Sequence, residues 1–516
     1  MWILLILCLI LLILIKYLFK LNKDYYILSL CKRIKTIDGR PLEEKIVIIP
    51  GLTRFGNNFD LLSMTPEKLF NFCREKNAFS RGKSYLLHFL FSTVYSITSA
   101  EDAEEVFQST TIITKSVIYE LLKPFLGDGL LISTDQKWHF RRKILTPAFH
   151  FNVLQSFNEI FKEESVKLLN KLQKLENSDI DVADIITEFT LNNICETALG
   201  VKLDDISGSE EYRKTIHDIE TTIVHRLCNP LLYYKILFYL FGEYRKQMDS
   251  IKIAHDFSSK IIKKKRQEYL AQTRLRQDDP QENEFGVKKR YAMLDTLLAE
   301  EAKGFIDHQG ICDEVNTFTF EGYDTTSTCL IFTILNLALH PEVQQKCRKE
   351  IQDLADFANL TVFDFNKLEY LECVLKETLR LYPSVPFVAR ISTAETRLNG
   401  LILPPNCQIN VHIYDIMRDP KHFPEPNLFK PERFLADVSA KRHPFAFVPF
   451  SAGSRNCIGQ KFAILEMKSV LVAILKNFDI LPITKLEDLI FENGLILRTQ
   501  QKVYVKLKKI SEIKQQ

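Results

Sequence analysis

The sequence lacks any pair of cysteines spaced for a zinc site or a local disulfide. No C-x-x-C occurs among the eleven cysteines, and Cys457 in "PFSAGSRNCIGQKFA" has no second cysteine within thirty residues. Structural zinc sites need paired Cys or His at short spacing, so Cys457 does not belong to one. An odd number of scattered cysteines indicates reduced thiols in a protein that faces the cytosol. Two uses remain for Cys457: a catalytic nucleophile, or the single protein ligand of a cofactor metal.

The sequence also lacks a charge imbalance, internal repeats and low-complexity segments. Its formal net charge is only +3 over 516 residues, so nucleic acid is not an expected partner. Most stretches show helical periodicity, and short β-like segments occur at 84–98, 396–414 and 502–507. The charged stretch 263–290 predicts a solvated helix end followed by a loop. The pattern predicts a mainly α fold with minor β, without βαβ alternation.

Only the N-terminus has an apolar run long enough to cross a membrane. "MWILLILCLILLILI" is uncharged, and Lys16 near its end could extend its ammonium group to the lipid headgroups. No basic region precedes the run and no small-x-small cleavage site follows it, so a cleaved signal peptide is disfavoured. Because basic residues follow the run, the body should remain cytosolic. We therefore expect a transmembrane signal anchor at 1–21, a basic linker at 22–49 and one catalytic domain at 50–516.

The residues around Cys457 suit a buried thiolate. A helix expected to begin just after Cys457 would offer free N–H groups and a favourable dipole to the sulfur. Gly459 would let that backbone come close, and Gly453 would allow the preceding turn. Arg455 is spaced to meet an anionic group of a cofactor, and Phe450 could shield the sulfur from water.

The segment "FSAGSRNCIG" resembles the haem-binding loop of cytochrome P-450, the haem-thiolate monooxygenases. The resemblance implies the cytochrome P-450 fold, haem b as the cofactor and Cys457 as the axial ligand of its iron. A thiolate ligand increases electron density on the iron and favours O–O cleavage.

Further motifs of this family follow the expected order. In "ETLR", Glu377 and Arg380 are spaced i, i+3 on a helix and can pair; with Arg433 in "PERF" they resemble the family's buried network behind the haem. The resemblance implies that three more residues lie near a haem propionate. They are Trp138 and Arg142 in "WHFRR" and Arg390 in "PSVPFVAR".

The long apolar helix carries "EGYDTTS", in which polar groups would be costly unless they are used. Gly322 would leave room for dioxygen above the iron. Thr325 is expected to hydrogen-bond the oxygen ligand, and Asp324 is expected to relay protons as a general acid–base.

The stretch "EVNTFTFEGYDTT" (314–326) is similar to the signature of family 4, from which Asn316, Thr319 and Tyr323 depart. Family 4 implies hydroxylation of long aliphatic chains; a fatty acid, hydrocarbon, terpenoid or xenobiotic remains open as substrate. Pocket residues are expected at about 100–125, 215–245 and the strand after Arg390. The resemblance further implies that Glu321 forms an ester with a haem methyl group; the alternative is a protonated Glu321 bonded to a backbone carbonyl.

The resemblance also implies partners and a location. Electrons from NADPH would come from cytochrome P-450 reductase, with cytochrome b5 as a second candidate donor. A basic helix face with Lys137, Arg141 and Lys143 is a candidate docking site for the acidic reductase. The expected location is the endoplasmic reticulum membrane, crossed once, with the body on the cytosolic face.

Three alternatives stay open at this point. The first is a thiolate-haem isomerase or dehydratase of lipid peroxides, which would need no reductase. The second is a membrane-anchored haem-binding protein without turnover. The third is a cysteine hydrolase, although no histidine lies near Cys457 in the sequence.

Overall fold

The structure, a computed structural model, describes residues 33–51, 57, 60, 64–89, 92–233, 235–278 and 292–510. The membrane anchor expected at 1–21 and residues 279–290 of the charged stretch 263–290 lie outside these residues. In the part of the chain that the structure describes, none of the helices has both the length and the apolar character to cross a membrane.

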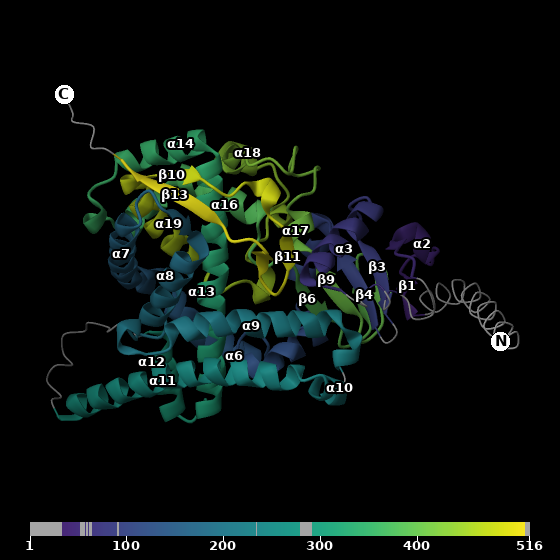
Figure 1. The fold of residues 1–516 in the computed structure, drawn as a ribbon. Helices are drawn as coiled ribbons and strands as arrows, with labels where there is room; N and C mark the ends of the chain where they lie inside the picture. The colour runs from purple at the N-terminus through teal and green to yellow at the C-terminus, as the bar shows by residue number, and fades with distance from the viewer. Residues whose placement is uncertain are drawn as a thin grey trace, which may run out of the picture.

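The described chain is mostly helical, as expected, and a long central helix runs through it (Figure 1). This helix, α13 (His308–Leu339), begins where the Asp307 side chain accepts a hydrogen bond from the Gly310 amide. It ends before Pro341, whose ring cannot continue the helix, as the sequence predicts. Helix α8 (Val182–Thr197) packs along α13 and is itself largely buried.

The other described α-helices surround α13 or cover the sheets. In chain order they are α2 (Leu42–Lys45), α3 (Pro66–Phe79), α4 (Ala100–Gln108), α5 (Lys123–Leu126), α6 (Asp135–Leu145), α7 (Phe151–Lys174), α9 (Ser209–Cys228), α10 (Lys235–Leu240), α11 (Glu243–Asp278), α12 (Met293–Ala302), α14 (Pro341–Gln352), α15 (Val362–Asn366), α16 (Glu369–Leu381), α17 (Ile413–Ile416), α18 (Ala436–Ser439) and α19 (Gln460–Asn477).

The strands form small sheets. They are β1 (Lys35–Thr36), β2 (Val47–Ile48), β3 (Tyr85–Phe89), β4 (Ser92–Ile97), β5 (Asp179–Asp181), β6 (Val388–Ile391), β7 (Thr396–Leu398), β8 (Leu401–Leu403), β9 (Gln408–Val411), β10 (Phe478–Pro482), β11 (Phe491–Asn493), β12 (Leu497–Thr499) and β13 (Tyr504–Lys509). The largest sheet has the order β2-β3-β4-β9-β6 and lies beside α3 at one end of the molecule (Figure 1). The three β-like segments expected from the sequence are confirmed as β3–β4, β7–β9 and β13.

Part of the expected linker belongs to the fold. Strand β1 pairs with β8, and β2 pairs with β3, so residues 35–48 are built into two sheets. Leu42, Ile46 and Ile49 are buried there. The basic linker expected at 22–49 therefore overlaps the fold at 35–48, because the apolar side chains between its charges have a core to enter.

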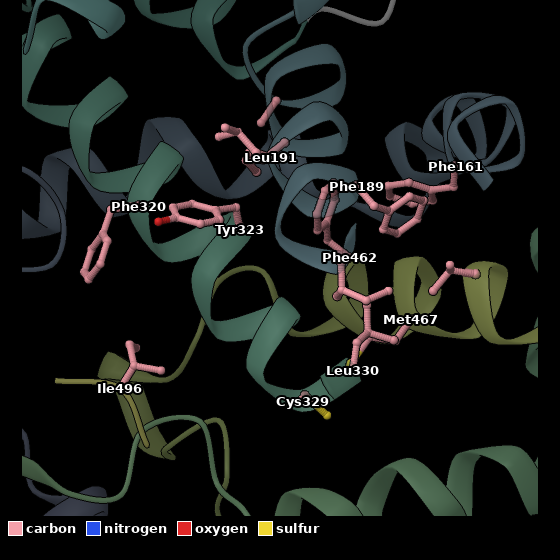
Figure 2. Close-up of a cluster of buried hydrophobic side chains, with 14 of the residues drawn as sticks. Phe161, Phe189, Leu191, Phe320, Tyr323, Cys329, Leu330, Phe462, Met467 and Ile496 are labelled. Carbon is pink, nitrogen blue, oxygen red and sulfur yellow. The ribbon is translucent and has the colours of Figure 1, made fainter. Parts of the chain in front are cut away.

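Aromatic side chains hold α19 against the helices around it (Figure 2). The rings of Phe161 on α7 and Phe462 on α19 meet edge to face with centroids 5.1 Å apart. The ring of Phe149 links α19 to α13, because it stacks on Phe318 of α13 with centroids 5.5 Å apart and meets Phe462 edge to face at 6.3 Å. Each large apolar side chain buried this way stabilises the fold by roughly 1.5–3 kcal/mol. The segment that follows Cys457 is thus fixed relative to α13.

Candidate active site

An apolar cavity lies between α13 and the segment 449–467 that leads into α19. Its walls bring together most of the site residues predicted from the sequence, although these come from distant segments. They are Trp138, Arg142, Glu321, Gly322, Thr325, Phe450, Arg455, Cys457 and Gly459.

The other residues that line the cavity can be compared with the three segments predicted to form the substrate pocket. The stretches 100–125 and 215–245 do contribute, through Leu122 and Ile223 among others. The strand after Arg390 does not, because β6 turns into the sheet and only its first residue, Val388, faces the cavity. The hairpin near the C-terminus, which the sequence analysis missed, supplies Ile496 instead.

The loop that carries Cys457 is fixed by backbone contacts. The Cys457 amide donates to the Phe450 carbonyl at 2.9 Å. Gly453 has φ +71°, and a Cβ there would lie 1.8 Å from the Phe107 carbonyl oxygen, so this turn requires glycine as expected. At Gly459 a Cβ would touch only the Cys457 sulfur, at an ordinary 4.0 Å. The backbone of Gly459 does come close to the sulfur, as expected, since its amide interacts with the Cys457 thiol.

The thiol of Cys457 opens into the cavity. Burial away from bulk water raises its pKa to about 11, and the charge of Glu321 adds to this, while the Gly459 amide and Arg142 lower the pKa. An unligated Cys457 is then a neutral thiol near pH 7, which is a poor nucleophile. Among the described residues that line the cavity there is no histidine to act as a base. The site therefore disfavours a cysteine hydrolase and suits a metal, which removes the proton from a coordinating thiol.

Arg142 and Arg455 hold the Cys457 loop as well as facing the cavity. Arg142 donates to the backbone and side-chain oxygens of Asn456 at 2.8 and 2.7 Å. Arg455 donates to the Leu130 carbonyl at 3.3 Å and lies 4.2 Å from the centre of the Trp138 ring. The Nε atom of Arg455 is buried and has no hydrogen-bond partner among the described groups.

Three cations gather at one side of the cavity. Arg390, on β6, is buried and donates only to its neighbour's carbonyl among the described groups. Lys115, which the sequence analysis missed, pairs through its backbone with Arg390. Burial and the like charge of Arg390 lower the pKa values of both Lys115 and Arg455, the latter to about 9. Such crowding of positive charge calls for an anion between these side chains.

Glu321 faces the same cavity from α13. Burial raises its pKa to about 7, and the positive charge of Lys115 lowers it. No basic residue lies within a helical turn of Glu321 in the sequence, and Lys115 reaches its neighbourhood only through the fold. Among the described contacts, Glu321 forms no ion pair within 4.0 Å and no side-chain hydrogen bond.

Gly322 and Thr325 occupy the next turn of α13. A Cβ on Gly322 would lie 2.6 Å from the Ile194 side chain, so glycine is required here for packing against α8. Gly322 also lines the cavity, and the space for dioxygen expected there stays a prediction. The Thr325 hydroxyl donates to the Glu321 carbonyl at 2.7 Å and lines the cavity.

Asp324 is buried but does not line the cavity. Its Oδ2 lies 2.7 Å from Nη2 of Arg498 on β12. The sequence analysis placed Asp324 beside Thr325 in the chain and missed Arg498, since no local signal links β12 to α13.

Glu377 and Arg380 meet on α16 without exposure to solvent. Their side chains share hydrogen bonds of 2.7 and 2.8 Å. The Nε of Arg433 lies 3.4 Å from the same carboxylate, so the three residues expected to cluster are in contact. Arg380 also donates to three backbone carbonyls of the stretch 417–428, which ties this long loop to α16.

The proposed docking face on α6 needs correction. Arg141 is buried; it donates to the Gly310 carbonyl and lies 3.7 Å from Glu314. It therefore cannot contact a reductase, because α12 and α13 cover it. Lys137 forms an ion pair with Asp128, and Lys143 is exposed.

The three departures from the family 4 signature leave the cavity wall unchanged. Asn316, Thr319 and Tyr323 are buried, and none of them lines the cavity. The Tyr323 ring instead lies 6.0 Å from that of Tyr212 on α9.

The residues present fit a haem. Cys457 offers one thiol for the iron, Lys115 and Arg455 line the cavity and suit the propionates, and apolar walls suit the ring. Arg390 does not line the cavity, but it is buried next to Lys115 and adds positive charge there. This set of donors supports the haem-thiolate interpretation without reference to any relative.

Comparisons with known proteins agree with the site. The sequence profile described as "Cytochrome P450" matches residues 49–507. The chain is 61% identical to "Probable cytochrome P450 4ac1" of Drosophila melanogaster, over 95% of each chain. It is 45% identical to "Probable cytochrome P450 4p3" over 96% of this chain and 97% of the relative, and 37% identical to "Cytochrome P450 4d2" over 84% and 89%, both from that organism. The chain thus belongs to the cytochrome P450 family, and the relatives that it resembles here are family 4 members.

Proposed function

We propose that this cytochrome P450 monooxygenase hydroxylates a long lipophilic molecule at a haem ligated by Cys457. The observation that carries the proposal is that Cys457 and Thr325 face one apolar cavity from different walls. Bound haem supplies the chemistry of oxygen activation. Cys457 would bind the haem iron. The propionates would be held by three cations, Lys115, Arg390 and Arg455. Thr325 and Asp324 would deliver protons to the oxygen-binding side.

The apolar lining favours aliphatic substrates over polar ones. Leu122, Ile223 and Ile496 offer dispersion contacts and no hydrogen bonds, so affinity should grow with chain length. A screen for type I spectral shifts with fatty acids of increasing length, hydrocarbons and terpenoid esters tests this. We expect saturable shifts with the long chains and a product that requires NADPH and reductase. Conversion of a lipid peroxide without NADPH would favour the isomerase or dehydratase instead.

The remaining parts of the proposal concern location and partners. The apolar run at 1–21 supports a single-pass anchor in the endoplasmic reticulum membrane with the body on the cytosolic side. Electrons would come from NADPH-cytochrome P450 reductase, with cytochrome b5 as a second donor. Lys143 is the member of the expected basic face that stays available for such docking.

Thr325→Ala is expected to uncouple NADPH oxidation from product formation. The variant loses the hydroxyl that lines the cavity, so proton delivery fails and hydrogen peroxide accumulates while product per NADPH falls about tenfold or more. Thr333→Ala is the matched control, because its hydroxyl makes the same 2.7 Å bond to the carbonyl four residues earlier and does not line the cavity. Equal coupling in Thr325→Ala and wild type would remove Thr325 from the mechanism.

Glu321 is proposed to form an ester with a haem methyl group, in which a C–O bond to the carboxyl would replace one methyl C–H bond; this two-electron oxidation would use the dioxygen and NADPH electrons of the enzyme's own turnover. A buried carboxyl without an ion pair is costly when charged, and esterification removes that charge. After turnover, chromatography under acid-denaturing conditions should show haem co-eluting with the polypeptide. Glu321→Ala should release the haem, and wild-type protein before turnover is the matched control. Fully extractable haem after turnover would reject the ester and would leave the monooxygenase assignment intact.

A further inference from the structure

A buried cluster of charged groups links helix α9, which contributes to the cavity wall, to helix α13, which carries Thr325. Arg498 on β12 donates from Nη2 to Asp324 on α13 at 2.7 Å, and from Nε to Glu220 on α9 at 2.8 Å. Its Nη2 also contacts the same Glu220 oxygen. Helix α9 passes over the cavity and lines it with Ile223, one turn beyond Glu220.

The cluster holds two carboxylates and one guanidinium. The side chains of Glu220 and Asp324 are 7% and 2% exposed, whereas that of Arg498 is 27% exposed. The other carboxyl oxygen of Glu220, Oε1, is buried and has no hydrogen-bond partner among the described groups. If both acids were ionised, a net negative charge would remain in a largely dry site, which is costly. The arrangement therefore favours one bound proton.

Electrostatics assign that proton to Glu220. Burial raises its pKa to about 8, and the charge of Asp324 adds to the rise, against the opposing effect of Arg498. The other titratable groups that face the cluster come from three elements: Tyr323 on α13, Tyr212 and His217 on α9, and Glu492 on β11. Burial raises the pKa of Tyr323 far above neutral, so His217 is the neighbour whose own titration has to be separated from that of Glu220.

We propose that Glu220 is a positioning residue that keeps an exchangeable proton next to Asp324, so that Asp324 can be reloaded after each proton that it delivers. In each cycle the proton moves from the Glu220 carboxyl to the Asp324 carboxylate, and Glu220 is reprotonated from solvent at the partly exposed edge of Arg498. No electrons are transferred in these steps. The inference rests on the proposed role of Asp324 and Thr325 in proton delivery.

Glu220→Gln tests the proposal, because the amide oxygen can still accept from Arg498 but the side chain cannot release a proton. The first readout is infrared spectroscopy of the haem-loaded full chain as a function of pH. Wild type should show a carboxylic acid C=O band that disappears with a midpoint near pH 8, and Glu220→Gln should lack that band. His217→Asn is the matched control and should keep it. A band that persists unchanged in Glu220→Gln would overturn the proposal.

The second readout is the pH profile of coupling. Wild-type product per NADPH should decline above about pH 8, whereas Glu220→Gln should be low at every pH, by about tenfold at pH 7. Glu220→Asp restores an ionisable group and should recover part of the coupling, which loss of structure alone would not allow. Wild-type coupling and pH profile in Glu220→Gln would contradict the inference. Failure of the proposed function would give a different result from failure of this inference. Thr325→Ala and Asp324→Asn would then keep full coupling, while the infrared band of Glu220 would still be present.

Should Glu220→Gln fail to fold, thermal unfolding of Glu220→Leu and wild type keeps the test open, because leucine is of similar size and has no proton to release. A carboxyl whose pKa is raised in the folded state contributes most to the free energy of unfolding below its usual pKa. This contribution is lost as the pH rises towards the pKa in the folded state. The free energy of unfolding that is lost through ionisation of Glu220 should therefore grow between about pH 4.5 and 8 and stay constant above pH 8. A variant that relieves the cost of ionisation should differ from wild type most at high pH. A difference independent of pH would count against a protonated Glu220.

Discussion

Cys457→Ser is expected to abolish the thiolate signature of the reduced carbon-monoxide difference spectrum. Serine is a harder and more weakly acidic ligand, so it does not supply the electron density that a thiolate gives to iron. The Cys457 loop itself should survive, since it is held by the Cys457 amide and by Arg142 through Asn456, and neither contact uses the sulfur. The measurement is the difference spectrum of the purified full chain together with its haem content.

The control for this variant is Cys312→Ser. Cys312 lies on α13, is half-buried and does not line the cavity, so its replacement should leave the spectrum unchanged. Retention of the thiolate band in Cys457→Ser would reject Cys457 as the iron ligand, and loss of the band in both variants would point to general unfolding.

Glu377→Gln is expected to destabilise the fold strongly, although Glu377 does not line the cavity. The change leaves the fully buried guanidinium of Arg380 without a counter-charge and also removes the partner of Arg433. Breaking a buried ion pair by removing one partner costs roughly 3–5 kcal/mol. Because Arg380 also holds the carbonyls of 417–428, we expect haem loss and a lower unfolding temperature together.

Glu210→Gln is the matched control for this variant. Glu210 pairs with Lys214 on α9 at 2.6 Å, but their side chains are 71% and 75% exposed, so solvent screens the pair. Its replacement should leave the unfolding temperature unchanged within error. A Glu377→Gln variant with the stability and haem content of wild type would show that the buried network is dispensable.

Much of the site could be predicted because its parts are local. The Cys457 loop is set by a turn that only Gly453 allows and by a helix that starts shortly afterwards, so a few adjacent residues suffice to identify it. The i, i+3 and i, i+4 spacings on helices predicted that Glu377 contacts Arg380 and that Trp138 and Arg142 share a face. Arg141, one residue from Arg142, shows the limit of this reasoning. The spacing of residues along α6 does not indicate which face of α6 is covered by α13.

The sequence by itself determined the helical class, the candidate iron ligand and the polar turn of α13 that faces it. These depend on backbone geometry over a few residues, which the side chains fix locally. Only the tertiary structure decided which distant charges meet: Lys115 with Arg390 beside the cavity, and Arg498 between Asp324 and Glu220. The chain holds 68 Lys and Arg and 65 Asp and Glu residues, so charge alone allows thousands of pairings. Packing of the apolar faces brings a few of these pairs into a dry interior, where the cost of an unpaired charge makes the choice specific.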